Sequence, residues 1–138
     1  QLLTEIVLNA ESTANSEHAN YVQDVAQYID ENYDQDLSLE VLAEKFNVTK
    51  SYLPRQFKAQ MGLTRSEYLT QVRIQAAKEI LRKSNTPIHE VAKMVGVDNI
   101  SYFIKLFKKY EQLTPHAYRN KWSGKDSPVP LFKASESK

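Results

Sequence analysis

The chain has 138 residues with 18 basic and 17 acidic side chains, for a formal net charge of +1 at pH 7. It contains no cysteine and three glycines, which excludes thiol chemistry and disulfides and leaves little room for a glycine-rich phosphate loop. Apolar runs are too short to span a bilayer and the start lacks a secretion signal, so we expect a soluble, cytoplasmic protein without membrane association. Gln at position 1 is compatible with a piece of a longer protein.

Charge is unevenly divided along the chain. Residues 1–49 hold ten acidic side chains and one basic side chain, whereas residues 50–125 hold fifteen basic and five acidic ones. This division favours a polyanion-binding surface on the second, larger part. The alternative is that two solvated helical surfaces simply differ in sign.

The N-terminal segment predicts a linker between two helices. Apolar side chains in residues 2–10 recur at helical spacing and a small, polar stretch follows, so residues 1–18 are interpreted as the end of a preceding helix and a linker. A helix is then predicted over about residues 19–33. Its apolar stripe comprises Tyr21 or Val22, Val25, Ile29 and Tyr33.

A helix-turn-helix pattern follows at about residues 37–61. Ser38 is a candidate N-cap of a short helix, and Asn47 is expected to end this helix because Asn tolerates a left-handed backbone. Thr49 can cap a third helix that runs to about Gln60.

A long helix is predicted over about residues 65–83, because Thr64 and Glu67 match a capping box at its start. Its inner face is expected to contain Tyr68, Leu69, Val72, Ala76, Ile80 and Leu81.

The helix-turn-helix pattern returns at about residues 87–110. Thr114 and Pro115 then open a last short helix that runs through Trp122. Residues 123–138 are rich in Pro, Ser and Lys, so we expect a flexible C-terminal tail.

The two helix-turn-helix patterns are copies of one another. SYLPRQFK at residues 51–58 returns as SYFIKLFK at residues 101–108, and LSLEVLAEKFNV at 37–48 aligns with TPIHEVAKMVGV at 86–97. A stacked array usually needs about three repeats, so two copies favour a duplicated motif with two equivalent surfaces.

The second helix of each copy has an inner and an outer side at about 100° per residue. The inner side contains Leu53, Phe57 and Gln60 in the first copy and Phe103, Phe107 and Tyr110 in the second. The outer side contains Ser51, Pro54, Arg55 and Lys58 in the first copy and Ser101, Ile104, Lys105 and Lys108 in the second. Hydroxyl, apolar and cationic groups on one stripe are the mixture that major-groove reading needs.

The long helix gives a suitable spacing for two such surfaces. About 20 residues at about 1.5 Å each make roughly 30 Å, which is close to the roughly 34 Å between successive major-groove segments on one face of B-DNA. One chain is therefore predicted to place two recognition helices in adjacent major grooves.

Enzymatic function is not predicted. His18, His89 and His116 lack the spacing of metal ligands, and the chain has no paired carboxylate cluster, phosphate loop or nucleophile elbow. We therefore expect no catalytic residues, no metal and no cofactor.

Three segments resemble the AraC/XylS family of bacterial transcription regulators. They are LSLEVLAEKFNVTKSYLPRQFK, YLTQVRIQAAKEIL, and IHEVAKMVGV followed by SYFIKLFKKYEQLTPHAYR. The resemblance covers about Tyr21 to Trp122. It implies an all-α fold of about seven helices, with two helix-turn-helix units joined by a long linker helix. It also implies an upstream effector-binding, dimerisation or receiver domain.

The resemblance further implies which positions face the bases. They are Ser51, Pro54 and Arg55 in the first unit and Ile100, Ser101, Ile104 and Lys105 in the second. Pro54 departs from the family pattern because it lacks a backbone N–H and crowds the carbonyl of Lys50, so we expect a kink or a later start of its helix. Val97 and Arg65 stand where the family often has Phe and an apolar residue.

The leading prediction is a transcription regulator that binds double-stranded DNA sequence-specifically. Its predicted DNA-binding residues are Ser51, Pro54, Arg55, Lys58, Ile100, Ser101, Ile104, Lys105 and Lys108. Its expected protein partners are RNA polymerase and an upstream regulatory domain. The alternative is a helical protein-interaction module that contacts RNA polymerase or a partner domain through acidic positions such as Asp24 or Glu31.

Overall fold

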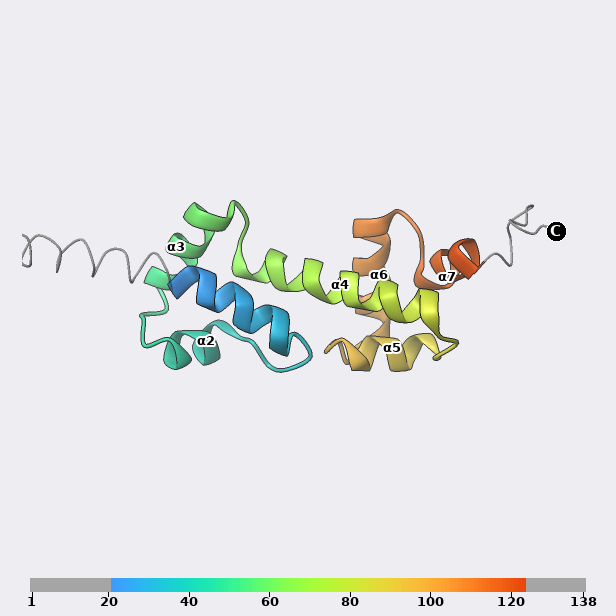
Figure 1. Cartoon of the computed structure of the whole chain (residues 1–138), viewed down its shortest axis with the longest axis horizontal. Coiled ribbons are helices and arrows are strands. Elements are labelled where there is room, and N and C mark those ends of the chain that lie inside the picture. Colours follow the sequence, from blue (N-terminus) through green and yellow to red (C-terminus); the bar gives the residue numbers. More distant parts are fainter. Residues whose placement is uncertain (1–20, 124–138) are drawn as a thin grey trace, which may run out of the picture. The chain divides into compact units, whose positions relative to one another are not determined.

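A computed structural model describes residues 21–123, and all regular secondary structure within them is helical. After helical residues 21–32 come α2 (Leu39–Lys45), α3 (Tyr52–Met61), α4 (Arg65–Lys83), α5 (Ile88–Met94), α6 (Ile100–Glu111) and α7 (Pro115–Ser123) (Figure 1). This confirms the predicted all-α architecture with seven helices for the part described. No helix in this part is both long and apolar enough to cross a membrane. The predictions for residues 1–18 and for the tail beyond Ser123 lie outside the described residues.

Two compact units divide the chain between Leu69 and Thr70, within α4. The described residues of the first unit are 21–69. Its core contains Val22, Val25, Ile29, Leu37, Leu42, Leu53, Phe57 and Leu69. The ring of Phe57 also meets that of Tyr68 edge-on, with 5.7 Å between the centroids. Val22, Val25 and Ile29 of the stripe predicted for the first described helix therefore pack into the core, whereas Tyr33 lies past the end of this helix and is half-buried.

Local hydrogen bonds fix the helix ends of the first unit as predicted. The Ser38 hydroxyl accepts from the N–H of Val41 at 3.3 Å, and the Thr49 hydroxyl accepts from the N–H of Tyr52 at 3.0 Å. Asn47 lies between these caps with a φ of 58°. Because Asn tolerates this left-handed conformation, the chain can turn sharply from α2 into α3.

Pro54 delays the start of α3, which is one of the two predicted outcomes. The helix begins at Tyr52, whereas α6 begins at Ile100, two positions earlier in the repeat. Proline has no N–H, so it cannot donate to the carbonyl of Lys50 and the regular helical ladder starts later. Pro54 lies in the first turn of α3, and the Leu53 N–H before it donates to the Thr49 carbonyl at 3.2 Å, so the bond to the Lys50 carbonyl is the one that proline removes.

The predicted capping box starts α4. The Thr64 hydroxyl accepts from the N–H of Glu67 at 3.0 Å, and the Glu67 carboxylate accepts from the N–H of Thr64 at 2.8 Å. Two N–H groups at this helix start therefore have partners, and α4 has the predicted bounds, Arg65–Lys83.

The buried face of α4 differs in part from the predicted one. Leu69 and Leu81 are buried as expected, but Ile74 and Ala77 are buried too. The predicted inner residues that are only half-buried are Tyr68, Val72, Ala76 and Ile80. The helix carries two apolar stripes at three- and four-residue spacing, and periodicity alone does not tell which one meets the core.

The second unit, described over residues 70–123, repeats the local signals of the first. The Asn99 side chain accepts from the N–H of Tyr102 at 3.0 Å, and the Thr114 hydroxyl accepts from the N–H of Ala117 at 3.1 Å. Gly96, with a φ of 94°, takes the left-handed position at the turn. Helix α6 contacts both α5 and α7. The core of the unit includes Ile74, Ala77, Leu81, Val91, Val95, Phe103, Phe107 and Tyr118.

The predicted inner sides of α3 and α6 are correct except near their C-terminal ends. The fully buried residues are Leu53, Phe57, Phe103 and Phe107. Gln60 is exposed and Tyr110 is half-buried, so the prediction of Gln60 as an inner residue is wrong. An amide without partners costs free energy to bury, and in the last turn of α3 this side chain faces solvent instead.

Candidate nucleic-acid interface

The outer side of α3 presents the first predicted set of polar side chains. The opposite side of α3 is buried in the core, whereas Ser51, Arg55 and Lys58 are exposed. Pro54 is half-buried. Three of the four predicted residues therefore have the accessibility that ligand contact requires, and Pro54 offers a smaller apolar surface.

A hollow of about 610 Å³ lies over the turn between α2 and α3. Ser51 and Arg55 of the predicted set line it, together with Glu44, Asn47 and Thr49. A carboxylate and a guanidinium thus border one concave site. Arg can bind a guanine edge and Glu can accept from a cytosine amino group, so both residue types are capable of base recognition. Glu44 is not among the residues predicted from the sequence.

Helix α6 presents the second predicted set. Ser101, Lys105 and Lys108 are exposed, Ile100 is 37% exposed, and Ile104 is half-buried. The second unit thus exposes the same three positions of the repeat as the first unit; Ser and Lys recur at two of them, and the third holds Arg55 in the first unit and Lys105 in the second.

Long-range hydrogen bonds hold the start of α4 in the first unit. Arg65 Nη1 donates to the carbonyl of Leu37 at 3.0 Å, and burial lowers the pKa of this guanidinium. The Tyr68 hydroxyl donates to Asp30 Oδ1 at 2.9 Å. Burial, followed by this hydrogen bond, raises the pKa of Tyr68 to about 12. Arg65, which departs from the family pattern, therefore serves the fold of the first unit.

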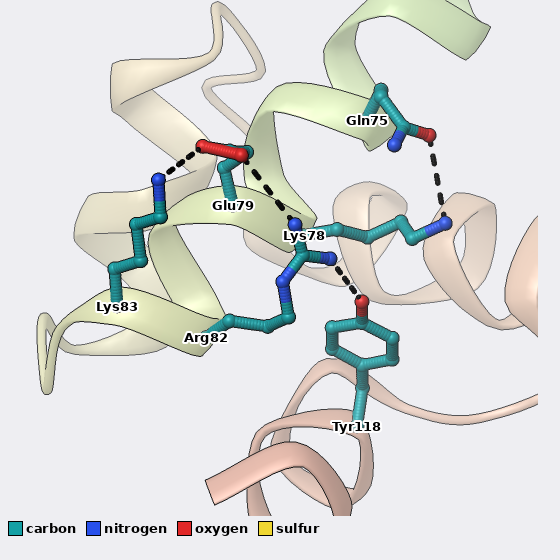
Figure 2. Close-up of polar contacts among 6 residues, drawn as sticks. All are labelled: Gln75, Lys78, Glu79, Arg82, Lys83 and Tyr118. Atoms are coloured by element: carbon teal, nitrogen blue, oxygen red, sulfur yellow. Dashed lines mark hydrogen bonds and ion pairs between the residues drawn. The ribbon is translucent and has the colours of Figure 1, made fainter.

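The C-terminal half of α4 is tied to the rest of the second unit by polar contacts, one of which, from Arg82 to Tyr118, is drawn in Figure 2. Lys78 Nζ lies 3.2 Å from Glu111 Oε1, and both side chains are about one-fifth exposed. Arg82 Nη1 donates to the Tyr118 hydroxyl at 2.7 Å. These two cations have partners within the protein.

Two further contacts involve basic groups near the end of α4. Lys83 Nζ lies 3.0 Å from the Glu79 carboxylate, and its hydrogen bond lowers the pKa of Glu79. Arg119, at 8% exposure, donates from Nε to the carbonyl of Leu81 at 3.2 Å. This bond satisfies a carbonyl in the last turn of α4 and places a positive charge at the end of the helix dipole that favours it.

The histidines do not form a metal site in the part of the chain that the structure describes. Within residues 21–123 no group of three or more His, Cys, Asp or Glu side chains is arranged to hold a metal ion. His89 and His116 are exposed, and His116 Nε2 lies 3.2 Å from the side-chain nitrogen of Asn120. His18 lies outside the described residues.

Two repeated units, each with a buried apolar side and an exposed polar stripe on its second helix, define a double helix-turn-helix protein. A family model described as a helix-turn-helix domain matches residues 42–121. The regulatory protein SoxS of Escherichia coli strain K12 is 33% identical over 104 residues, which cover 75% of this chain and 97% of SoxS. The chain belongs to the AraC/XylS family of helix-turn-helix proteins.

Two further proteins are similar to this chain. The bifunctional transcriptional activator/DNA repair enzyme AdaA of Bacillus subtilis is 40% identical over 101 residues, which cover 73% of this chain. The chain spans 48% of the length of AdaA. The solved C-terminal domain of AraT, a response regulator from Geobacillus stearothermophilus, superposes with a TM-score of 0.71 at 40% identity, covering 72% of this chain and 84% of that one.

Proposed function

We propose that this chain is the DNA-binding part of a bacterial transcription regulator and that it binds double-stranded DNA sequence-specifically. The observation that carries the proposal is the repeated exposed stripe on α3 and α6. These stripes carry hydroxyl, apolar and cationic groups, which are the groups that bind base edges and phosphates in the major groove. The names of two relatives support it, because SoxS is called a regulatory protein and AdaA a transcriptional activator.

Arg55 and Lys105 are the proposed principal base contacts, because both can donate to O6 and N7 of a guanine. They occupy equivalent positions of the repeat and both are exposed. The other proposed contacts are the hydroxyls of Ser51 and Ser101, the apolar groups of Pro54, Ile100 and Ile104, and the phosphate-binding Lys58 and Lys108. The apolar groups suit the methyl group of thymine.

The proposal extends to the whole regulator. The binding domain comprises about residues 19–122, and its two units at about 37–61 and 87–110 address adjacent major grooves. An upstream regulatory domain controls binding, and contact with RNA polymerase passes the signal to transcription in the cytoplasm. No catalytic step is proposed for this chain, since the repair activity in the name of AdaA is that of a protein of which the chain spans 48%.

Selection from a random duplex library tests the proposal. Repeated binding to the full chain is expected to enrich a site with two conserved segments about one helical turn, or 10–10.5 bp, apart. Absence of binding to any duplex at low salt, or enrichment without a shared sequence, would refute sequence-specific DNA binding.

Single substitutions then test the proposed contacts on the selected site. Arg55→Ala and Lys105→Ala are each expected to weaken binding by about 1–3 kcal/mol and to relax the preference at one base pair. Lys121→Ala removes an exposed cation from α7 and serves as the control, with a smaller effect expected. If all three variants lose the same affinity without any change in base preference, the two residues bind phosphates and do not read bases.

A further inference from the structure

The described residues of the two units carry opposite net charges. Residues 21–69 have eight acidic and five basic side chains, a net charge of −3, whereas residues 70–123 have four acidic and ten basic side chains, a net charge of +6. Duplex DNA carries one negative charge per about 1.7 Å of its axis. The second unit is therefore attracted to any duplex, whereas the first unit as a whole is not.

Most cations of the first unit are engaged within the protein. Lys50 Nζ lies 3.8 Å from Glu40 Oε2, Lys45 Nζ lies 4.8 Å from the ring centroid of Tyr28, and Arg65 donates to a backbone carbonyl. The remaining cations, exposed and without an ion pair to any described residue, are Arg55 and Lys58.

The second unit has more exposed lysines without an ion pair to a described residue than the first unit has. Its paired cations lie on α4, where Lys78, Arg82 and Lys83 contact Glu111 and Glu79. Figure 2 shows Arg82 and Lys83 directed at the Glu79 carboxylate. The exposed lysines of α5, α6 and α7 that form no ion pair within residues 21–123 are Lys93, Lys105, Lys108, Lys109 and Lys121.

One position of the repeat shows this difference in charge beside the predicted DNA-binding residues. Glu44 in α2 aligns with Lys93 in α5, and both are exposed. Glu44 lines the same hollow as Arg55. Each residue lies in the last turn of its helix, where the helix dipole favours a positive charge and disfavours a negative one. Helix stability therefore favours Lys93 but does not account for Glu44.

We propose that the two units contribute unequally to DNA binding: the second unit, besides the base contact of Lys105, supplies most of the attraction to the phosphates of any duplex, and the first unit supplies most of the site selection, with Glu44 as a specificity-determining residue beside Arg55. This inference rests on the proposed function. When the protein is not aligned with its target site, the Glu44 carboxylate repels phosphates and opposes binding. In register, Arg55 can bind a guanine and Glu44 can accept a hydrogen bond from the amino group of a cytosine.

The salt dependence of binding to a mixed-sequence duplex tests the anchoring role. Two matched double variants, Arg55→Ala/Lys58→Ala and Lys105→Ala/Lys108→Ala, each remove two cations from equivalent positions. The mixed-sequence duplex lacks the selected site, so both Lys105 and Lys108 are expected to lie against phosphates on it. The slope of log affinity against log salt is therefore expected to fall by about 1.8 in the second-unit variant, or about 0.9 per phosphate contact. The first-unit variant is expected to lose less than half as much, and an equal or larger loss there would overturn the proposal.

Neutralisation of Glu44 tests its role in selection. At low salt, Glu44→Gln is expected to bind the mixed-sequence duplex about two- to threefold more tightly, and Lys93→Gln is expected to bind it about two- to threefold more weakly. This factor corresponds to the interaction energy of one charge about 8 Å from a phosphate in water. On the selected site Glu44→Gln should gain no affinity, or should lose it. The ratio of specific to non-specific affinity should therefore fall at least about twofold. An unchanged or higher ratio would remove Glu44 from this role.

The two proposals fail in different ways. If the unmodified chain binds no duplex at low salt, DNA binding itself is wrong. If it binds and selects a site but the two double variants lose the same salt dependence, only the division between the units is wrong. Thermal melting of each variant by circular dichroism confirms that a change in binding is not a loss of fold.

Discussion

Gly62 and Gln112 occupy the same position of the repeat and provide a matched test of backbone strain. Both have a left-handed backbone, with φ of 83° and 66°. Each N–H donates to the carbonyl four residues earlier, that of Lys58 at 2.9 Å and that of Lys108 at 2.8 Å. We predict that replacement by alanine destabilises the protein at Gly62 and is nearly neutral at Gln112.

The magnitude follows from the surroundings of Gly62. A Cβ atom placed there has no heavy atom within 4 Å, so the cost comes from the backbone alone. The left-handed conformation destabilises a residue other than glycine by about 1–2 kcal/mol. Alanine also lowers the conformational entropy of the unfolded chain, which stabilises the folded protein by about 0.4–1 kcal/mol. We expect Gly62→Ala to lower the free energy of unfolding by about 0.5–1 kcal/mol.

Gln112 already has the left-handed cost in the native protein. Its replacement by alanine removes only an exposed hydrogen bond from the side-chain amide to the carbonyl of Lys109, 3.2 Å long. Gln112→Ala is therefore expected to change stability by no more than about 0.5 kcal/mol. Gly62→Asn is a second control, because Asn tolerates this conformation better than Ala does.

Urea unfolding followed by far-UV circular dichroism measures these differences. For a slope of about 1.5 kcal/mol/M, Gly62→Ala should lower the midpoint by about 0.3–0.7 M. Equal losses for Gly62→Ala and Gln112→Ala would show that backbone conformation is not the cause. A loss above about 2 kcal/mol at Gly62 would point to a steric contact that the structure lacks.

Three further predictions concern the polar contacts of α4. Thr64→Ala removes the cap of this helix and should lower the free energy of unfolding, measured with urea, by about 1 kcal/mol. Glu67→Gln keeps an acceptor for the reciprocal bond and should lower it less. Tyr68→Phe should cost about 1 kcal/mol at pH 7 through loss of the bond to Asp30. Because burial and this bond raise the pKa of Tyr68 to about 12, above the value of about 10 in the unfolded chain, the contribution is present below pH 10. It is lost as the pH rises through 12, so the difference between wild type and variant should disappear there; a constant difference would contradict the assignment. Lys78→Met leaves the half-buried Glu111 carboxylate without its cation, so the free energy of unfolding is expected to fall by about 1–2 kcal/mol. The double variant Lys78→Met/Glu111→Gln should recover part of this loss. Additive losses in that double variant would mean that the two side chains do not interact.

The helix ends could be predicted because the signals that fix them are local. Ser38, Thr49 and Thr64 were identified as caps from their neighbours in the sequence, and each accepts the expected N–H in the structure. The left-handed backbone at Gln112 could not be predicted, because nothing in a glutamine side chain favours it. Burial of Ile74 was also missed, since it depends on which of two apolar stripes of α4 meets the core.

The candidate site could be predicted only along single helices. The repeat and the helical period placed Arg55 and Lys105 on exposed stripes, and both side chains are exposed in the structure. That they contact DNA stays a prediction. Glu44 was missed because it belongs to another helix and reaches the hollow beside Arg55 only through the fold. The structural role of Arg65 could not be predicted, since its hydrogen bond spans 28 positions of the sequence.

The division of α4 between two cores also determines where the chain can be cut. A fragment that ends at Gly62 would lack the donors that reach the Leu37 carbonyl and Asp30, and Phe57 would lose its ring neighbour. A fragment that continues through Leu69 keeps these contacts and one more buried side chain. A chimera that exchanges one helix-turn-helix unit for that of a relative should therefore be spliced in the middle of this helix and not in the loop before it.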